Sequence, residues 1–281
     1  MKRLSGVIFF LIVVVSLSLQ LWAASQRSYW EDEAFIPIIA SRGPIESTKV
    51  ADWDVHPPYH FIVTYWGKIL GFEELALRFL SILFLEFALF LTYILARAML
   101  GPSTALYSVA LLAFSPLFVM FGYNARYYSL AAMLALLVVY SMWRYQTNAK
   151  LAYLALYIAS SILFLYLLFA ALFVIIACNI WWFLIWWQKK GHSRSRLLIW
   201  ILAQSLILAG FIPGLQVILG VMQRAPEVAS TSNWLTELIK RFIYTAYVFC
   251  LGETLSPLNP LAWLGGLVIV GTALLAIKYL P

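Results

Sequence analysis

Three adjacent carboxylates form the densest negative charge in the chain. Glu31, Asp32 and Glu33 follow one another in a sequence of which only 11% of residues are charged. In a low-dielectric setting such groups repel one another, and one of them becomes a better proton acceptor unless a cation lies nearby. The triplet therefore suggests a general base. The simpler interpretation is a solvated acidic patch that ends the preceding apolar segment.

Two further segments carry polar side chains suited to chemistry. DWDVHPPYH places His56 before two prolines, which predict an extended turn that holds the imidazole in a fixed direction. SPLFVMFGYNARYYSL places Arg126 and Tyr127 in a short turn between two apolar runs. A guanidinium presents a planar fork that suits phosphate. An Arg that snorkels to lipid head groups would give the same pattern.

The composition indicates an integral membrane protein with helical spans. Hydrophobic residues make up 64% of the 281 residues, and the mean hydropathy is +0.89, whereas soluble domains are roughly half apolar. The apolar runs are long and continuous, which favours helices over the strands of a barrel. The net charge of +7 comes from bases scattered at the ends of these runs. The bases form no continuous stripe, so the charge does not indicate a nucleic-acid-binding protein.

The apolar runs predict about eight spans. Six runs lie at residues 4–24, 78–99, 103–121, 127–145, 197–219 and 261–280. The segment 151–187 is long enough for two more helices with a turn near 169–171. The first run is interpreted as an uncleaved helix rather than a signal peptide, because its apolar part exceeds the usual length. Glu86 lies inside the second span, and its polar partner is expected on another helix.

The basic residues predict the orientation of the spans. With a cytoplasmic N-terminus, the inner turns contain only bases, and QKKGHSRSR (188–196) is the strongest cytoplasmic signal. Eleven of the twelve acids then lie in outer segments. The polar chemistry is therefore expected on the extracytoplasmic face of a plasma or inner membrane. It should lie mainly in a first outer loop, 25–77, with a second long outer segment at 220–260.

The first outer loop is expected to form amphipathic helices that lie on the membrane surface. EAFIPIIASRG has Phe35, Ile38 and Ile39 on one predicted apolar face and stops at Gly43. YHFIVTYWGKILG predicts a second helix of this kind. These helices would hold the acids and His56 on rigid supports at the membrane boundary.

Four segments occur in a fixed order along the first half of the chain. They are DEA (32–34), HPP (56–58), LALRFLS (75–81) and SPLFVMFGYNARYYSL (115–130), with GETLSP (252–257) as a weaker fifth. Together they resemble the GT-C glycosyltransferases of the protein mannosyltransferase and aminoarabinose transferase type, over roughly residues 1–145. The resemblance implies an inverting enzyme that uses a polyprenyl-phosphate sugar, undecaprenyl or dolichyl. The acceptor would be a protein, a lipid or a glycan on the outer face.

The resemblance also implies roles for particular residues. Asp32 would be the catalytic base, and Glu33 would support it or organise the acceptor. Arg126, with Tyr127 beside it, would bind the donor phosphate. A carboxylate on the acceptor side and an Arg on the leaving phosphate are what such a transfer needs, because a lipid phosphate departs without a general acid.

Supporting residues and cofactors follow from the same resemblance. His56 and Glu31 would support the site, as would Asn124, which stands where many relatives carry an acid. No cofactor is required, although Asp32 and His56 have donor atoms for a divalent metal. Relatives are usually longer, so the chain is interpreted as a compact or C-terminally truncated single transmembrane domain.

Two other functions fit a polytopic membrane protein. The first is a transporter or flippase for a lipid-linked sugar, which predicts internal repeats and broken helices at mid-membrane. The two halves of the sequence show no repeat. The second is a non-catalytic scaffold in a glycan-assembly complex, which would tolerate the loss of Asp32.

Overall fold

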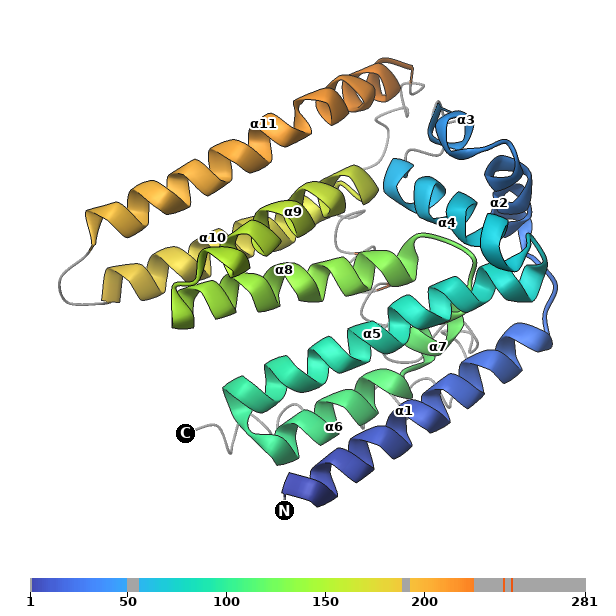
Figure 1. Cartoon of the computed structure of the whole chain (residues 1–281), viewed down its shortest axis with the longest axis horizontal. Coiled ribbons are helices and arrows are strands. Elements are labelled where there is room, and N and C mark those ends of the chain that lie inside the picture. Colours follow the sequence, from blue (N-terminus) through green and yellow to red (C-terminus); the bar gives the residue numbers. More distant parts are fainter. Residues whose placement is uncertain (1, 50–55, 189–192, 225–239, 241–243, 245–281) are drawn as a thin grey trace.

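The chain is an all-helical bundle in the part that the computed structural model describes, residues 2–49, 56–188, 193–224, 240 and 244 (Figure 1). These residues form eleven helices and no strand, which confirms the predicted fold class. The helices are α1 (Lys2–Ser25), α2 (Glu31–Ser41), α3 (Pro44–Lys49), α4 (Pro57–Leu70), α5 (Glu74–Leu100), α6 (Pro102–Ala113), α7 (Pro116–Gly122), α8 (Tyr128–Asn148), α9 (Leu151–Leu167), α10 (Ala171–Gln188) and α11 (Arg194–Arg224).

The helices match the predicted spans closely. Among the described residues, α1, α5, α8, α10 and α11 are long and apolar enough to cross a membrane, and α6 with α7 gives a sixth, bent span. Apolar α9 has 17 residues, or about 25 Å of helix, and α10 begins after the predicted turn. All seven spans predicted within the described residues therefore coincide with helices. The eighth, 261–280, and most of the outer segment 220–260 lie outside them.

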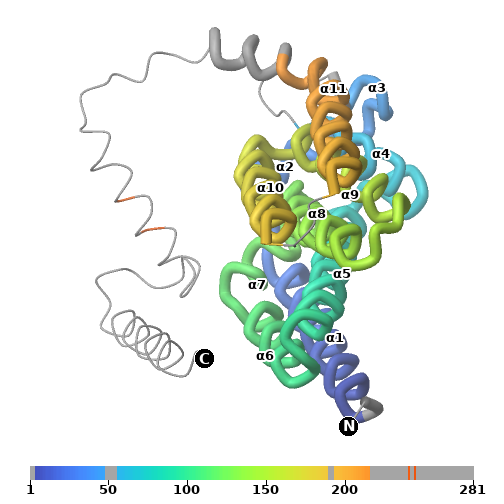
Figure 2. Tube along the Cα trace, turned by 90° about the vertical axis from the view of Figure 1, so that its left-hand side faces the viewer, coloured from blue at the N-terminus to red at the C-terminus, as the bar shows by residue number. Residues whose placement is uncertain are grey.

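The spans stack in an order that differs from their order in the chain. Figure 1 shows α11 at one edge, followed by α9 with α10, then α8 and α5, with α6 and α1 at the other edge. Figure 2 shows the same division, with α1 and α6 below α8–α11. Helix α8 is central, because it packs against both α5 and α9. The buried Ser141 and Ser160 bond to carbonyls of their own helices, and small residues allow the backbones to approach closely.

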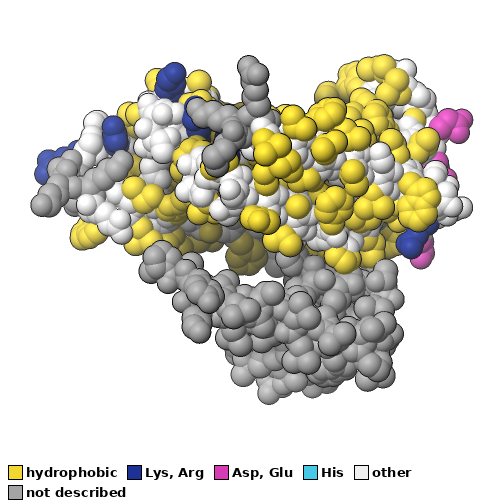
Figure 3. Space-filling model, turned by 90° about the horizontal axis from the view of Figure 1, so that it is seen from below, with side chains coloured by type: hydrophobic (Ala, Val, Ile, Leu, Met, Phe, Trp, Pro, Cys, Tyr) yellow, Lys and Arg dark blue, Asp and Glu magenta, His cyan; other side chains and the backbone are white. Residues whose placement is uncertain are grey.

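The two ends of the bundle differ in charge. The α5–α6 and α8–α9 connections, the end of α10 and the start of α11 lie at the end that holds the N-terminus, and α2, α3 and α4 lie at the other end (Figure 1). Most Lys and Arg side chains visible in Figure 3 gather at one end, and the visible Asp and Glu side chains gather at the opposite end. The alternation of turns predicted from the bases is thus present in the fold.

The span predicted at 103–121 is broken rather than straight. Helix α6 ends at Ala113, and α7 begins at Pro116 with its axis bent by 59°. A residue before proline is disfavoured in the helical conformation, and Ser115 has an extended ψ of 137°. Its hydroxyl accepts a hydrogen bond from the Phe118 amide at 3.2 Å, which caps α7. The break directs the chain into the turn 123–127.

The first outer loop forms three helices in its described part, where two were predicted. Helices α2 and α4 confirm the two predicted elements, and the short α3 between them was not predicted. Pro57 and Pro58 belong to a helix, and the residues that precede His56 lie outside the described part of the chain. The two prolines occupy the first turn of α4, where a missing N–H costs little, and His56 precedes them as the N-cap residue.

The three residues of the predicted apolar face of α2 do not share one environment in the bundle. Phe35 and Ile38 are exposed, whereas Ile36 is fully buried and Ile39 nearly so. The buried stripe also contains Glu33, which forms an ion pair with α5. That charged contact turns the helix, so two apolar side chains face outward to the surroundings of the bundle.

Candidate active site

A buried ion pair between α2 and α5 forms the base of the site. Arg78 Nη2 donates to Glu33 Oε2 at 2.8 Å, and Arg78 Nε donates to Glu33 Oε1 at 3.2 Å. Both side chains are 1% exposed. The two parallel bonds match the fork of the guanidinium to the carboxylate, which is the strongest geometry for such a pair. The pair fixes the start of α2 against α5.

Arg78 also holds the connection between α1 and α2. Its Nη1 donates to the carbonyl oxygens of Ala24, at 2.8 Å, and Arg27, at 2.5 Å, and its Nη2 donates to that of Ser28 at 3.1 Å. Glu74 Oε1 lies 2.6 Å from Nη1. One buried guanidinium therefore satisfies the end of α1 and orders the chain that leads to the acidic triplet.

Aromatic rings enclose the same guanidinium. The carbon at its centre lies 5.1 Å from the ring centroid of Tyr29 and 5.4 Å from that of Tyr123, within the range of cation–π attraction. Burial, followed by the nearby Glu74 carboxylate, raises the pKa of Tyr29 well above its usual value. Burial also raises the pKa of Tyr59 in α4. Both phenols therefore lose their protons less readily than an exposed tyrosine.

The turn that carries Arg126 is held from three helices. The Ala125 amide donates to Glu33 Oε1 of α2 at 2.6 Å, and the Ser81 hydroxyl of α5 donates to the Arg126 carbonyl at 3.4 Å. The Ser129 hydroxyl of α8 donates to the Gly122 carbonyl at 3.0 Å. Glu33 therefore joins the acidic segment to this turn as well as to Arg78.

Arg126 lies directly against Asp32. Its Nη1 donates to the main-chain carbonyl oxygen of Asp32 at 3.2 Å. The Arg126 side chain is buried, and its guanidinium lies 5.4 Å from the ring centroid of Tyr127. Asp32 and Tyr127 are half-buried. The fold thus brings together two residues that the sequence separates by 94 positions.

His56 completes this cluster from the start of α4. Its ring centroid lies 3.5 Å from that of Tyr127, and its Nδ1 is 2.5 Å from the carbonyl oxygen of Leu167 at the end of α9. A carbonyl only accepts, so Nδ1 is the donor, and Nε2 is the acceptor in the neutral ring. His56 therefore connects α4, α9 and the turn of Arg126.

The other predicted site residues lie at the edge of this cluster. Glu31 is exposed in the first turn of α2, where negative charge complements the helix dipole. Asn124 is buried, and its carbonyl accepts from the Arg126 amide at 2.6 Å. Within the described ranges, no group of three or more His, Cys, Asp or Glu side chains is arranged to hold a metal ion.

A cavity opens beside the connection that Arg78 holds. Its volume is about 300 Å³, and its lining is mostly the polar main chain and side chains between α1 and α2 together with the start of α5. The lining residues are Ala24, Ser25, Gln26, Arg27, Ser28, Glu74 and Leu75.

The sequence did not predict a role in the site for two of these residues. Arg78 and Ser81 lie in the segment LALRFLS, which serves above only as a landmark. The available signal was a charged residue near the start of a long apolar helix, where an ionisable group is costly without a partner. The partner comes from a distant segment, so periodicity within α5 does not identify it.

Comparison with known proteins gives a family match. A model of the dolichyl-phosphate-mannose-protein mannosyltransferase family matches residues 55–216, more than half of the chain. The matched range includes His56, Arg78 and Arg126, and the acidic triplet lies before it. No curated protein and no solved structure matches the chain. The chain belongs to the dolichyl-phosphate-mannose-protein mannosyltransferase family and is a multi-pass membrane glycosyltransferase of the GT-C type, with a lipid-linked sugar as donor.

Proposed function

We propose that the chain transfers one sugar from a polyprenyl phosphate, undecaprenyl or dolichyl, to an acceptor on the extracytoplasmic face, with inversion at the anomeric carbon. The observation that carries this proposal is the hydrogen bond from Arg126 to the main chain of Asp32. It supports a single site in which a proton acceptor and a phosphate-binding cation work on one donor. Hexosyl and pentosyl donors both fit this chemistry, and the acceptor is a hydroxyl of a protein, a lipid or a glycan.

The proposed step uses both side chains. The acceptor oxygen attacks the anomeric carbon, and its proton passes to the carboxylate of Asp32. The bond between that carbon and the phosphate oxygen breaks, and the electron pair stays on the phosphate. The guanidinium of Arg126 stabilises the resulting charge. The polyprenyl chain lies along the apolar spans in the bilayer.

Glu33 has a positioning role in this proposal. Its two oxygens accept hydrogen bonds from Arg78, from the Ala125 amide and, at 3.3 Å, from the Trp30 amide. A carboxylate engaged in this way sets the distance between the segment of Asp32 and the turn of Arg126. His56 and Tyr127 hold the other side of that turn, where we place the phosphate end of the donor.

The experiment compares variants of the two reacting residues with matched controls. Asp32→Asn keeps the shape of the side chain and removes the base, so the turnover rate should fall by about 100-fold or more. Arg126→Ala should raise the KM for the donor and lower turnover. Glu73→Gln and Arg42→Ala alter exposed charges of the same kinds and should retain activity. The assay first screens membranes with several polyprenyl-phosphate sugars and then uses purified protein.

Two results would overturn the proposal. Wild-type transfer rates in both Asp32→Asn and Arg126→Ala would show that neither residue has the catalytic role proposed for it. Movement of a lipid-linked sugar across proteoliposomes by a protein that transfers nothing would favour the flippase. Normal glycan assembly in cells that carry Asp32→Asn would favour the scaffold.

A further inference from the structure

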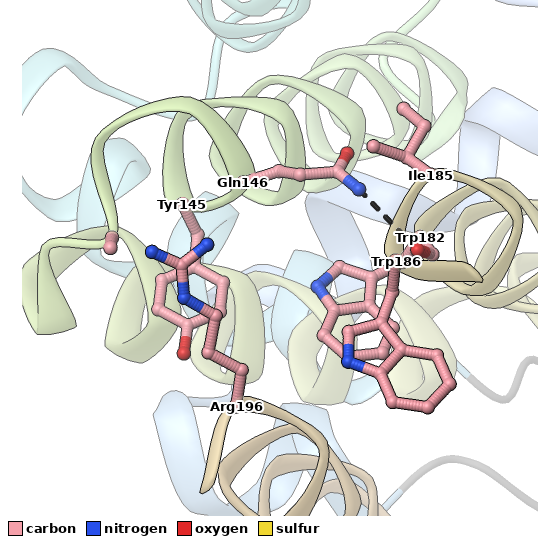
Figure 4. Close-up of a pocket in the computed structure, with 7 residues that line it drawn as sticks. Tyr145, Gln146, Trp182, Ile185, Trp186 and Arg196 are labelled. Atoms are coloured by element: carbon pink, nitrogen blue, oxygen red, sulfur yellow. Dashed lines mark hydrogen bonds between the residues drawn. The ribbon is translucent and has the colours of Figure 1, made fainter. Parts of the chain in front are cut away.

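A second hollow, lined mostly by apolar surface, lies at the opposite end of α8 from the candidate active site. Three helices line it: α8 with Tyr145 and Gln146, α10 with Trp182 and Trp186, and α11 with Arg196 (Figure 4). Its enclosed volume is about 30 Å³, and the empty space rises to about 350 Å³ when the open mouth is included, so a ligand would lie mainly at the mouth. Helix α8 has 21 residues, so about 30 Å separates the two sites. The hollow therefore takes no part in the proposed transfer.

Stacked aromatic rings give this hollow a rigid wall. The rings of Trp182 and Trp200 are nearly parallel, with an interplanar angle of 2° and centroids 4.7 Å apart. The ring of Trp186 is also nearly parallel to that of Trp182, with centroids 6.2 Å apart, and Tyr145 stacks on Trp200 at 6.2 Å. Trp and Tyr are enriched where a membrane meets water. This wall is therefore suited to a ligand at the level of the lipid head groups.

Two polar groups face the hollow and define the chemistry of a ligand. Arg196 is exposed and lies beside Tyr145 (Figure 4). Gln146 Nε2 donates to the Trp182 carbonyl at 3.4 Å, and its buried Oε1 accepts no hydrogen bond within the described part of the chain. A ligand that fits these two groups has an anionic group to bind the guanidinium and a neighbouring hydrogen-bond donor to bind the amide oxygen.

No acidic side chain near in sequence can neutralise this end of the bundle. The sequence contains no Asp or Glu between Glu86 and Glu227, while it contains nine Lys and Arg there. The faces of α10 and α11 that continue from the hollow are apolar and exposed, as in Phe183, Leu184, Trp187, Leu198, Ile201 and Leu202. An anion with attached acyl chains fits both features, because a bilayer covers these faces and places its phosphates at the level of the aromatic wall.

We propose that this hollow binds an anionic phospholipid whose phosphate contacts Arg196 and whose head-group hydroxyl donates to Gln146 Oε1. Phosphatidylglycerol has both groups. Its acyl chains would lie on the exposed faces of α10 and α11. The site is distinct from the donor site and does not depend on the proposed transfer.

The test measures lipid preference with the full chain in nanodiscs. Brominated phosphatidylglycerol at low mole fraction should quench the tryptophan fluorescence of the wild type more than brominated phosphatidylcholine does. Arg196→Ala should weaken the apparent affinity for phosphatidylglycerol by about tenfold, and Arg196→Lys should weaken it less. Arg194→Ala is the matched control, because Arg194 is exposed in the same turn of α11 and does not line the hollow.

Several outcomes would overturn this proposal. Equal losses in Arg194→Ala and Arg196→Ala would show a general charge effect at the membrane surface. Equal quenching by both lipids in the wild type would exclude a phosphatidylglycerol site. Lipid-free protein that retains inorganic phosphate through Arg196, without any lipid preference, would make this a phosphate site. Because Arg196 is exposed, its variants should fold, and their unfolding temperatures check this directly.

Discussion

Arg78 shows how one side chain can determine the geometry of an active site without touching the reacting atoms. Its donors bind the carboxylate of Glu33 and three main-chain carbonyls, and two aromatic rings cover its faces. A lysine has the charge but lacks the planar fork, so it cannot serve these acceptors together. Glu33 then passes the constraint to the turn of Arg126 through the Ala125 amide.

From the Glu33–Arg78 ion pair we predict how much each of several substitutions lowers the stability of the protein. Arg78→Met leaves a buried carboxylate without its cation and should cost about 3–5 kcal/mol. Arg78→Lys should cost less, because a cation remains beside Glu33. Glu33→Gln should also cost less than Arg78→Met, because Glu74 still faces the guanidinium, although the NH2 of the new amide must face an N–H donor in either orientation. Thermal unfolding in detergent measures the order. Glu74→Gln is the control, since Glu74 is 38% exposed and an exposed pair contributes little. A loss in Glu74→Gln equal to that in Arg78→Met would contradict this account.

Two substitutions of His56 can distinguish the effect of its ring contact from the effect of its hydrogen bond. His56→Phe keeps a ring against Tyr127 and loses the bond to the Leu167 carbonyl, whereas His56→Ala loses both. If the ring positions the turn of Arg126, His56→Ala should raise the donor KM by about tenfold, and His56→Phe should raise it by less. Steady-state kinetics with varied donor measures both. A His56→Phe variant as impaired as His56→Ala would instead assign the effect to the imidazole nitrogen.

At the scale of elements, the break between α6 and α7 places the phosphate-binding turn. An unbroken span would continue along the α6 axis, whereas α7 leaves at 59° and ends at Gly122 beside α1 and α5. A Cβ at Gly122 would lie 2.7 Å from Gln20 Nε2 and would collide with Leu85. A larger residue would require the side chains of Leu85 and Gln20 to move, so the turn of Arg126 depends on the packing of three helices.

Substitution of Gly122 provides a direct test of that packing. Gly122→Ala should push α7 from α1 and α5, lower stability by about 1–3 kcal/mol and reduce transfer, because the turn of Arg126 follows directly. Gly6→Ala is the matched control, since a Cβ at Gly6 meets nothing within 4 Å. Unfolding temperature and transfer rate are measured for both variants. Equal behaviour of the two would show that α7 adapts without moving the turn.

The sequence predicted the spans well because length and continuous hydrophobicity are local properties. It placed Asp32 and Arg126 at one end of the bundle for the same reason, since charge at the ends of spans follows chain order. It did not predict which side of α2 packs against the bundle, namely the side of Glu33, Ile36 and Ile39. A contact across 45 positions, from Glu33 to Arg78, determines that orientation, and no local pattern reports it.

At the scale of the whole molecule, the bundle separates two kinds of polar chemistry. One end holds the acidic triplet and the turn of Arg126, and the other holds basic turns that lack carboxylates. Positive residues prefer the cytoplasmic side of short loops. This distribution supports an extracytoplasmic candidate active site and a cytoplasmic hollow at Arg196, and the two inferences share one orientation.

This orientation is testable with single cysteines in a background in which Cys178 and Cys250 are replaced by Ala. Ser41→Cys lies at the candidate active-site end and Thr147→Cys at the opposite end, and both positions are exposed. A membrane-impermeant maleimide added to intact cells should label Ser41→Cys and leave Thr147→Cys unmodified until the membrane is permeabilised. Labelling of Thr147→Cys alone in intact cells would invert the bundle and place Asp32 and Arg126 on the cytoplasmic side, where an extracytoplasmic acceptor has no access.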